Sequence, residues 1–334
     1  MQAVLSIIIV NYNSAKLITD CIASIYRFTN PGFFELLVVD NGSSPNDQQT
    51  IQGRFPEVRW VSMKDNAGFA RANNEGIRQS NGDVVLLLNP DTVVENNAIG
   101  DCFNTFISSG YVACGVQLLN PDHTPQISGN YSMKGGLNYL LPLPYLGNIL
   151  KLFGQAIKIK KPHAEAGVTV AEVDWINGAF LMVKKSAIEK SGLLDEDFFL
   201  YAEEAEWCSR LRRIGKLCIY GQISVIHLQG ETANTTFEST GKGYYNLFDR
   251  KGLQIMVSNF VRIRKEFGLG WFLLQLFFYT IEIPVFFVGL LIEKLFGKTN
   301  YNFKLATGYA KNVFQLLHLS PRIIKNEPYF YKVL

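Results

Sequence analysis

The sequence predicts an α/β fold with a mostly parallel central sheet flanked by helices, followed by a C-terminal helical region. Three observations lead to this expectation. Short apolar segments alternate with helical patterns through the first hundred residues, which is typical of a parallel α/β sheet. Acidic and amide residues directly follow several of these segments. Residues 246–334 carry 12 Lys and Arg against 5 Asp and Glu, whereas residues 1–245 carry 20 against 24.

Length and composition indicate one catalytic domain, residues 1–245, plus a smaller appendage, residues 246–334. The 334 residues are 48% hydrophobic, which is enough for a large core. The five cysteines form no closely spaced pair, so we expect no disulfide framework or zinc knuckle and a reducing cytosol. The N-terminal apolar run lacks a preceding basic segment and a small-residue cleavage site, so it predicts a first strand rather than a signal peptide.

The elements can be assigned in chain order. Strands are predicted at Leu5–Val10, Phe34–Val39, Val58–Ser62 and Asp83–Leu88. Helices are predicted between or after them at Ala15–Phe28, Pro45–Arg54, Phe69–Gln79 and near Glu95–Ser108. After a strand near Val112–Val116, a loop at residues 120–147 is long enough to be functional or mobile. Regular structure returns with a loop and strand at Asp174–Val183, a helix from Glu203 to about Ile214 and a short strand at Ile223–Ile226.

The fourth predicted strand brings a carboxylate to the edge of the sheet. Its five apolar residues, Val84–Leu88, indicate a strand buried on both faces. Asn89, Pro90 and Asp91 follow directly, and ligands of α/β sheets bind outside the carboxyl ends of the strands. Asp91 is therefore placed where a hard cation could be held.

Asp40 ends the second predicted strand and is followed by turn residues. Such an acid can accept hydrogen bonds from a ribose hydroxyl or a base imide. The alternative is a carboxylate in a turn, with Ser43 or Ser44 capping the next helix.

A loop with a glycine, Asn66-Ala67-Gly68, opens the third predicted helix. Free N–H groups at its N-terminus, with Arg71 nearby, would favour a diphosphate, although Asn66 could be a plain N-cap. Asn73 and Asn74 are poor helix formers, so we expect them to hydrogen-bond to specific partners.

The run Leu269–Ile292 is near the length of about 20 apolar residues that crosses a bilayer. Its polar members fall on one stripe of a helix, and Pro284 would kink its middle, which favours a bent helix lying in the membrane interface over a straight span. The stripe consists of Gln275, Tyr279, Glu282, Gly289 and Glu293. Basic residues flank the run at Arg262, Arg264, Lys265, Lys294, Lys298 and Lys304. A buried helix of a soluble domain is the alternative, but the many aromatic residues favour a membrane.

These motifs resemble the family 2 glycosyltransferases of the GT-A fold, inverting enzymes that use nucleotide-sugar donors. The opening segment Ser6–Asn13 is similar to the first strand of that family, Asp40 to its nucleotide-binding acid, and Asn89-Pro90-Asp91 to its Asp-x-Asp motif. Downstream, Trp175–Phe180 and Asp195–Arg210 resemble the acceptor-side signature of the rhamnosyltransferase branch. The resemblance covers about residues 3–245. The chain departs from the signature at Glu204 and Glu206, where Asp is usual.

The resemblance implies roles for individual residues. Asp91 would hold Mg²⁺ or Mn²⁺ with His227 as a further ligand, and Glu204 would be the general base, with Glu203 as its neighbour and possible substitute. Acidic residues also favour first helical turns, and Glu206 is expected to pair with Arg210. Nucleotide-sugar contacts are implied for Val10, Tyr12, Asn13, Asp40, Asn66, Gly68, Arg71, Asn73 and Asn89. Acceptor-side contacts are implied for Trp175, Asn177, Gly178 and Tyr201.

The same resemblance suggests dTDP-L-rhamnose as the first donor to test and a polyprenyl-diphosphate-linked saccharide as acceptor, in building O-antigen, capsule or other envelope polysaccharide. The C-terminal region would dock the enzyme, as a peripheral or monotopic protein, on the anionic cytoplasmic face of the inner membrane. We expect no nucleic-acid partner, and the sequence leaves the oligomeric state open.

Two other functions are alternatives. One is a non-catalytic nucleotide-sugar-binding partner of a polysaccharide assembly complex, against which the combination of Asp91, Glu204 and His227 speaks. The other is a nucleotidyltransferase, which would require a glycine-rich loop near the N-terminus, and Ser6–Lys16 contains no glycine.

Overall fold

A computed structural model describes residues 4–131, 136–156, 164, 167–228, 234, 236–239, 246–297 and 301–333. The chain divides into two compact units. The first consists of Met1–Met133, Pro162–Phe199 and Glu203–Thr232, and the second of Lys134–Lys161, Leu200–Ala202 and Ala233–Leu334. The second unit therefore includes Lys134–Lys161 and Leu200–Ala202, and its last piece begins at Ala233, before the predicted boundary at residue 245.

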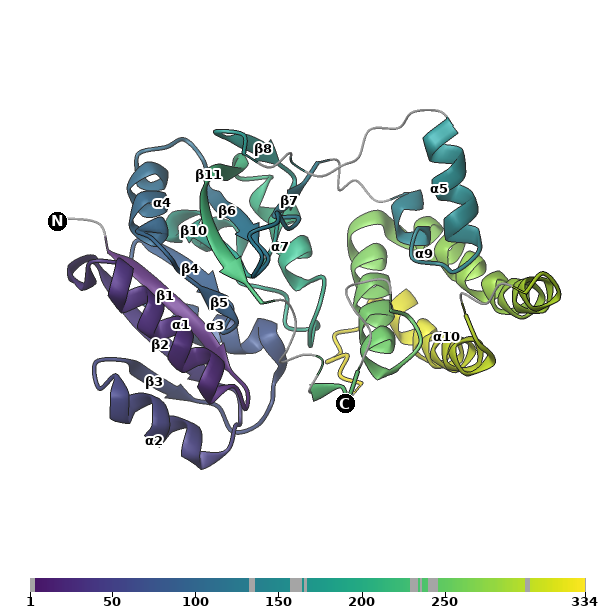
Figure 1. Cartoon of the computed structure of the whole chain (residues 1–334), viewed down its shortest axis with the longest axis horizontal. Coiled ribbons are helices and arrows are strands. Elements are labelled where there is room, and N and C mark those ends of the chain that lie inside the picture. The colour runs from purple at the N-terminus through teal and green to yellow at the C-terminus, as the bar shows by residue number, and fades with distance from the viewer. Residues whose placement is uncertain are drawn as a thin grey trace. The chain divides into compact units, whose positions relative to one another are not determined.

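The first unit is built on a nine-stranded sheet with the order β3-β2-β1-β4-β10-β6-β11-β5, in which β8 also pairs with β11 (Figure 1). Its strands are β1 (Leu5–Asn11), β2 (Phe34–Asp40), β3 (Arg59–Ser62), β4 (Val84–Leu88), β5 (Thr92–Val93), β6 (Ala113–Leu119), β8 (Ala171–Val173), β10 (Phe180–Lys184) and β11 (Leu217–His227). The strands β1 to β4 are mutually parallel, as the sequence predicts. The sheet becomes mixed at β10, which runs antiparallel to both β4 and β6.

Helices cover both faces of this sheet because its central strands alternate between two hydrophobic cores. Every residue of β1 and β4 is buried, which confirms the predicted burial of the fourth strand on both faces. Ile7 and Ile9 pack with α1 and α4, whereas Ile8 and Val10 pack with α3, α6 and α7. The helices of the unit are α1 (Ala15–Phe28), η1 (Pro31–Phe33), α2 (Pro45–Arg54), α3 (Gly68–Gln79), α4 (Ala98–Ile107), α6 (Lys185–Ser191) and α7 (Glu203–Leu211).

The structure differs from the sequence prediction mainly after residue 90. The predicted short strand before His227 is part of the eleven-residue β11, whose register against β6 shifts between Tyr220 and Ser224. The two-residue strand β5 was not predicted. The long loop at residues 120–147 contains β7 (Gly129–Asn130), which pairs with β9 (Trp175–Ile176), and η2 (Leu137–Leu140).

The described part of the second unit contains three longer helices, α5 (Leu146–Ala156), α9 (Arg250–Leu295) and α10 (Phe303–Ile324). Within the described length of α9, the helical backbone angles are interrupted at Gly268, with φ of 86°, and not at Pro284, where the sequence predicts a kink. Glycine adopts this left-handed φ without the steric penalty of a Cβ atom. The helix therefore consists of an N-terminal part that is largely buried and the apolar part that follows Gly268.

The polar stripe of α9 faces protein rather than solvent. Gln275 Nε2 donates to Gly136 O at 2.9 Å, and Tyr279 Oη donates to Tyr139 O at 3.1 Å. The Glu282 carboxylate accepts from the N–H groups of Tyr145 and Leu146 at 2.6 and 3.1 Å, where α5 begins. The stripe thus holds the segment that carries η2 and α5.

The opposite face of α9 is apolar and exposed. Its exposed apolar residues follow the helical repeat and include Leu274, Phe277, Ile281, Val288, Leu291, Ile292 and Leu295. By length and composition α9 is the one described helix that could cross a membrane, and 28% of its most apolar window is buried. Of the basic residues predicted to flank it, Arg262 is buried and bonded to Glu266 at 2.8 Å, and Lys298 lies outside the described residues.

Candidate active site at the carboxyl edge of the sheet

Strand directions bring the predicted site residues of the first unit to one edge of the sheet. β1, β2 and β4 are parallel, so Asn11, Asp40 and the segment after Leu88 share their carboxyl edge. Since β10 is antiparallel to both β4 and β6, and β11 is parallel to β6, β11 also ends there. His227, the last residue of β11, is therefore on the same edge as Asp91, although 136 positions separate them in the sequence.

Pairing between β5 and β11 places His227 beside Asp91. His227 pairs with Thr92, and the N–H of Leu228 donates to Asp91 O at 2.9 Å. The side chains consequently meet, with His227 Nε2 at 3.4 Å from Asp91 Oδ1. Both residues are buried, with 6% and 4% of their surface exposed. Burial of a carboxylate requires a nearby positive charge or hydrogen bonds, so the pair is suited to hold a cation.

The pair fits a divalent metal ion by its donor atoms and its spacing. A carboxylate oxygen and an imidazole nitrogen 3.4 Å apart can share one ion placed about 2.1 Å from each. Among the described residues no third His, Cys, Asp or Glu completes a metal cluster. The remaining coordination positions would thus be left to other oxygen ligands, as is usual for Mg²⁺ bound together with substrate phosphates.

A second group of polar residues surrounds the ends of β1 and β2. Asn11 Nδ2 donates to Asp40 Oδ1 at 3.1 Å and to Asp47 Oδ2 at 3.0 Å. Asp40 Oδ1 also accepts from the N–H of Ser43 at 3.3 Å, so this carboxylate is fixed at the strand end. Asn11 was not among the predicted site residues, although its position directly after an apolar strand was a signal for it.

Three predicted nucleotide-binding residues lie at or just after the end of β1. Val10 is buried within the strand, and Tyr12 is partly exposed beyond it. Asn13 is exposed. Its N–H donates to Ser43 Oγ at 2.9 Å, and its Oδ1 accepts from the N–H of Ser44 at 3.1 Å. The loops after β1 and β2 are therefore joined to each other.

The N–H groups at the start of α3, predicted to be free for a diphosphate, are engaged within the protein. The N–H groups of Ala67 and Gly68 donate to the side chains of Asn41 and Asn66 at 2.9 and 3.1 Å. The next one, that of Phe69, donates to Phe199 O at 2.8 Å. Gly68 has φ of 83°, and a Cβ there would clash with Phe199, so the position requires glycine.

Side chains on α3 bind a neighbouring loop and their own helix. Arg71 Nε donates to Glu196 O at 3.2 Å, and Asn73 Nδ2 donates to Phe69 O at 2.9 Å. Asn74 exchanges two hydrogen bonds with Leu194, which confirms the expectation of a specific partner for that residue. The roles of Asn66, Gly68, Arg71 and Asn73 in donor binding remain predictions.

The segment Trp175–Phe180 is connected to the segment Asn89-Pro90-Asp91 through one short loop. The N–H of Asn89 donates to Ala179 O at 3.0 Å. Asn177 Oδ1 accepts from the N–H of Ala179 at 3.0 Å and so shapes this loop. A Cβ on Gly178 would lie 3.4 Å from Glu204 Cγ, which shows that the loop packs on the candidate base.

Trp175 and the first turn of α7 hold the candidate base. Trp175 Nε1 donates to Glu204 Oε1 at 3.2 Å, and both residues are buried. Glu203 is also buried, and within the described part of the chain its Oε2 has no hydrogen-bond partner. Burial raises the pKa of Glu203 well above its usual range, and the Glu204 carboxylate adds to the rise. The two adjacent acids thus have different environments.

Glu206 and Tyr201 are the remaining predicted residues of this stretch of sequence. Glu206 binds Arg210 with two contacts of 2.7 Å, the ion pair that the sequence predicts. Tyr201, predicted on the acceptor side, belongs to the second unit. It has a left-handed backbone with φ of 71°, and Ala202 has φ of 68°. Left-handed conformations at two consecutive non-glycine residues are strained and occur mainly at functional segments.

Gln126 is a further residue that the sequence prediction missed. It lies in the long loop after β6, is buried, and contacts His227 through its side-chain amide. A lone glutamine in a loop rich in Gly, Pro and Asn carries no local signal for such a contact.

Comparison with known proteins identifies the family. The family model described as glycosyl transferase family 2 matches residues 6–163. The low-salt glycan biosynthesis hexosyltransferase Agl10 of Haloferax volcanii is 30% identical over 254 residues, which cover 74% of either chain. The N-acetylglucosaminyl-diphospho-decaprenol L-rhamnosyltransferase of Mycobacterium tuberculosis is 25% identical over 237 residues, which cover 66% of this chain and 74% of the relative.

Solved structures show the same fold. The mannosyltransferase PcManGT of Pyrobaculum calidifontis, in complex with GDP-Man and Mn²⁺, superposes with a TM-score of 0.53 at 14% identity over 98% of this chain and 85% of the other. The mixed sheet with its flanking helices is thus a GT-A fold, as the resemblance implied. Family model, sequence relatives and fold agree, and the chain belongs to glycosyltransferase family 2.

Proposed function

We propose that this chain is a metal-dependent inverting glycosyltransferase that moves a sugar from a nucleotide donor to a lipid-linked saccharide in envelope polysaccharide synthesis. The observation that carries the proposal is the convergence of Asp91, His227 and Glu204 on one edge of the sheet, through the contacts of Asn89, Ala179 and Gly178. A cation-holding pair and a buried base beside one short loop are what displacement at an anomeric carbon requires.

Proton transfer in this reaction is assigned to Glu204. Its carboxylate would take the proton of the acceptor hydroxyl as that oxygen attacks the anomeric carbon of the donor, and the bond to the nucleoside diphosphate breaks. The hydrogen bond from Trp175 Nε1 orients the carboxylate for this step. Glu203, whose pKa is raised by burial, is suited to remain protonated, so that Glu204 would carry the only charge of this adjacent pair.

Binding of the leaving nucleoside diphosphate is assigned to Asp91 and His227 at the same edge of the sheet. Asp91 and His227 would hold Mg²⁺ or Mn²⁺, and the ion would supply charge stabilisation for the departing diphosphate. Structural neighbours such as the Pyrobaculum mannosyltransferase contain Mn²⁺. Val10, Tyr12, Asn13, Asp40 and Asn89 would contact the nucleotide sugar, with Asn66, Gly68, Arg71 and Asn73 at α3.

The choice of donor and acceptor rests on the relatives. The mycobacterial relative is named as a rhamnosyltransferase acting on an N-acetylglucosaminyl-diphospho-decaprenol, which supports dTDP-L-rhamnose as first donor and a polyprenyl-diphosphate-linked saccharide as acceptor. Within the first unit, Trp175, Asn177 and Gly178 would lie on the acceptor side.

Association with an anionic membrane is assigned to the second unit. The exposed apolar face of α9 offers a long surface without charge, which is the kind of surface that inserts between lipid headgroups. The described α10 carries no acidic residue and exposes Lys304, Lys311 and Arg322. This charge is complementary to anionic lipids, and each such residue contributes about 1 kcal/mol near the surface.

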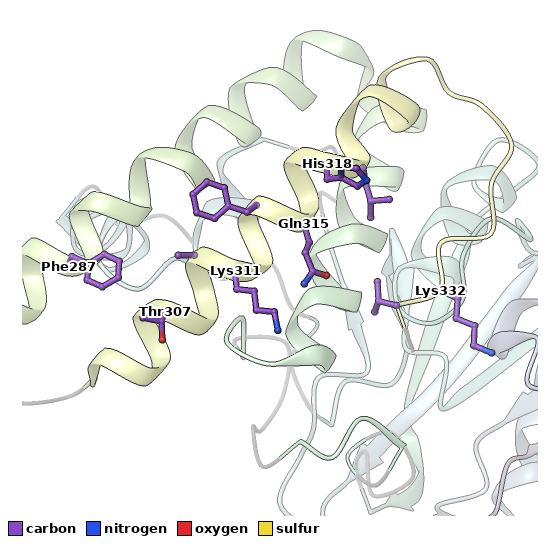
Figure 2. Close-up of a pocket in the computed structure, with 10 residues that line it drawn as sticks. Phe287, Thr307, Lys311, Gln315, His318 and Lys332 are labelled. Atoms are coloured by element: carbon purple, nitrogen blue, oxygen red, sulfur yellow. The ribbon is translucent and has the colours of Figure 1, made fainter.

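An open groove lies beside this basic helix. Figure 2 shows that Lys311, Gln315 and His318 project from α10 toward it, with Phe287 of α9 and Lys332 nearby. The groove has a volume of about 850 Å³, and its other lining residues are Thr307, Ala310, Phe314, Leu319 and Val333. Apolar walls with a cationic rim suit the boundary between acyl chains and headgroup phosphates, and support docking on an anionic lipid surface.

The experiment that tests this function is a donor panel with the purified protein. dTDP-, UDP- and GDP-sugars are each incubated with a polyprenyl-diphosphate-linked saccharide, with and without Mn²⁺, and nucleotide release and glycolipid product are measured. One active donor, a product with inverted anomeric configuration and a requirement for metal are expected. Nucleotide-sugar binding without transfer or hydrolysis for any donor would favour the non-catalytic alternative.

A further inference from the structure

Gln126 holds His227 through both ends of its side-chain amide. Gln126 Nε2 donates to His227 O at 2.6 Å, and Gln126 Oε1 lies 3.0 Å from His227 Nδ1. The backbone of Gln126 is itself fixed, because its N–H donates to Leu118 O at 2.8 Å on β6. Through Gln126, His227 at the end of β11 is therefore bonded to the neighbouring strand β6.

The orientation of this amide is determined by the oxygens around it. Besides His227 O, Nε2 donates to Asn120 Oδ1 at 2.9 Å and to Leu119 O at 3.2 Å. An amide turned by 180° would place its oxygen against these three oxygens and lose all three hydrogen bonds. The oxygen of Gln126 must therefore face His227 Nδ1, and an amide oxygen can only accept.

This orientation defines which nitrogen of His227 carries the proton. Nδ1 must be the N–H donor to Gln126 Oε1, so the neutral imidazole has its lone pair on Nε2. Nε2 faces Asp91 Oδ1 at 3.4 Å. In this tautomer two acceptors face each other in a buried place, and a cation or a proton between them removes their repulsion. The arrangement is that of two ligands prepared for one ion.

We propose that Gln126 is the positioning residue of this metal centre, which fixes the His227 tautomer so that Nε2 is available to the ion. The proposal rests on the metal-dependent transfer proposed above. Histidine ligands of metals usually donate their second ring N–H to a protein oxygen, and loss of that partner lowers metal affinity by about 10- to 100-fold. Here the partner is a neutral amide that also binds the histidine backbone.

The first test observes the tautomer directly, in protein labelled with ¹⁵N-histidine. The chain has four histidines, and the His227 signals are assigned by their loss in His227→Gln. We expect His227 Nδ1 to be protonated in the wild-type protein, both without metal and with Mg²⁺. A bare Nδ1 in the wild type would overturn the proposal, and this measurement requires no variant of Gln126 to fold.

The second test compares Gln126→Met with Gln254→Met. Gln254 is a matched control, because it is also buried and also donates through Nε2 to a backbone oxygen, Tyr331 O at 2.9 Å. Gln126→Met removes the acceptor for Nδ1–H, so the imidazole is expected to move its proton to Nε2. Binding of Mn²⁺ alone, followed by electron paramagnetic resonance, should weaken about 10- to 100-fold in Gln126→Met and remain unchanged in Gln254→Met.

The outcomes separate this proposal from the function it rests on. Equal Mn²⁺ affinity of wild type and Gln126→Met would overturn the role of Gln126 and leave metal-dependent transfer intact. Absence of a nitrogen ligand in the pulsed spectrum of wild-type Mn²⁺ would also overturn it, because His227 would then not be a ligand. Failure of sugar transfer in a protein that binds Mn²⁺ as expected would count against the proposed function alone.

Discussion

Trp175 Nε1 lies 3.2 Å from Glu204 Oε1 and donates a hydrogen bond to it inside the first unit. Through this contact the strand β9 holds the first turn of α7, and the loop after β9 joins the segment that leads to Asp91. A base candidate and a metal-ligand candidate from distant parts of the sequence are therefore connected by two hydrogen bonds and one packing contact.

Glu204→Gln is expected to fold, to bind the donor and to lose transfer by at least about 100-fold, the lower end of what a positioned base contributes. The amide can still accept from Trp175 Nε1 but cannot take a proton. Turnover is measured with the active donor of the panel, and nucleotide binding by calorimetry. Glu206→Gln is the matched control two positions away, where only the pair with Arg210 is weakened. Near-wild-type turnover in Glu204→Gln would remove this residue from the role.

Asp91→Asn is expected to abolish the response of the enzyme to added metal, because the charge that would attract the ion is lost while the shape is kept. The measurement is the rate of transfer as a function of Mn²⁺ concentration. Asp101→Asn, the same change at an exposed position of α4, should leave the metal response as it is in the wild type. A Mn²⁺ dependence that survives in Asp91→Asn would show that the ion is held elsewhere.

Glu203→Gln is expected to gain stability relative to the wild type as the pH rises. The pKa of Glu203 is raised in the folded state by burial and by Glu204, so its neutral form stabilises the fold. That contribution is fully present below the unfolded pKa of about 4.3 and is lost as the pH rises through the folded value. A neutral amide removes this loss. Melting temperatures of both proteins from pH 4 to pH 8 should diverge in favour of the variant.

The control for that pH series is Glu189→Gln, the same change at an exposed position of α6. A difference between Glu203→Gln and the wild type that stays constant over the whole range would contradict the raised pKa of Glu203.

Phe277→Glu is expected to weaken binding to vesicles that contain anionic lipid by at least tenfold. Phe277 is 57% exposed on the apolar face of α9, and withdrawal of a phenylalanine from an apolar environment costs about 1.5 to 3 kcal/mol. Cosedimentation with phosphatidylglycerol vesicles measures the effect. Ile214→Glu, an exposed apolar position of the first unit, serves as control. Equal losses in both variants would indicate a general effect of added charge and not a docking face.

The first half of the sheet could be predicted from the sequence because its signals are local. The strands β1, β2 and β4 are short, mainly apolar runs closed by polar residues, and parallel pairing then places Asp40 and Asp91 at one edge. The placement of His227 could not be predicted in the same way. It depends on the two-residue strand β5, which is too short to leave a periodic pattern.

Gln126 and the polar stripe of α9 were missed or misjudged for related reasons. Gln126 acts across 101 positions of sequence, and nothing near it indicates a histidine partner. The polar stripe of α9 was correctly recognised as a stripe, but periodicity does not tell whether a polar face meets water or a protein segment. Glu282 shows the difference, because its carboxylate is fully buried and caps the start of α5.

The most direct test of the central claim is a crystal structure with Mn²⁺ and the nucleoside diphosphate of the active donor, with data collected for the anomalous signal of manganese. We expect one anomalous peak within coordination distance of Asp91 Oδ1 and His227 Nε2, with the diphosphate on the same ion and its free end directed toward Glu204. A manganese peak held by other residues, or a nucleotide bound away from this edge of the sheet, would contradict it.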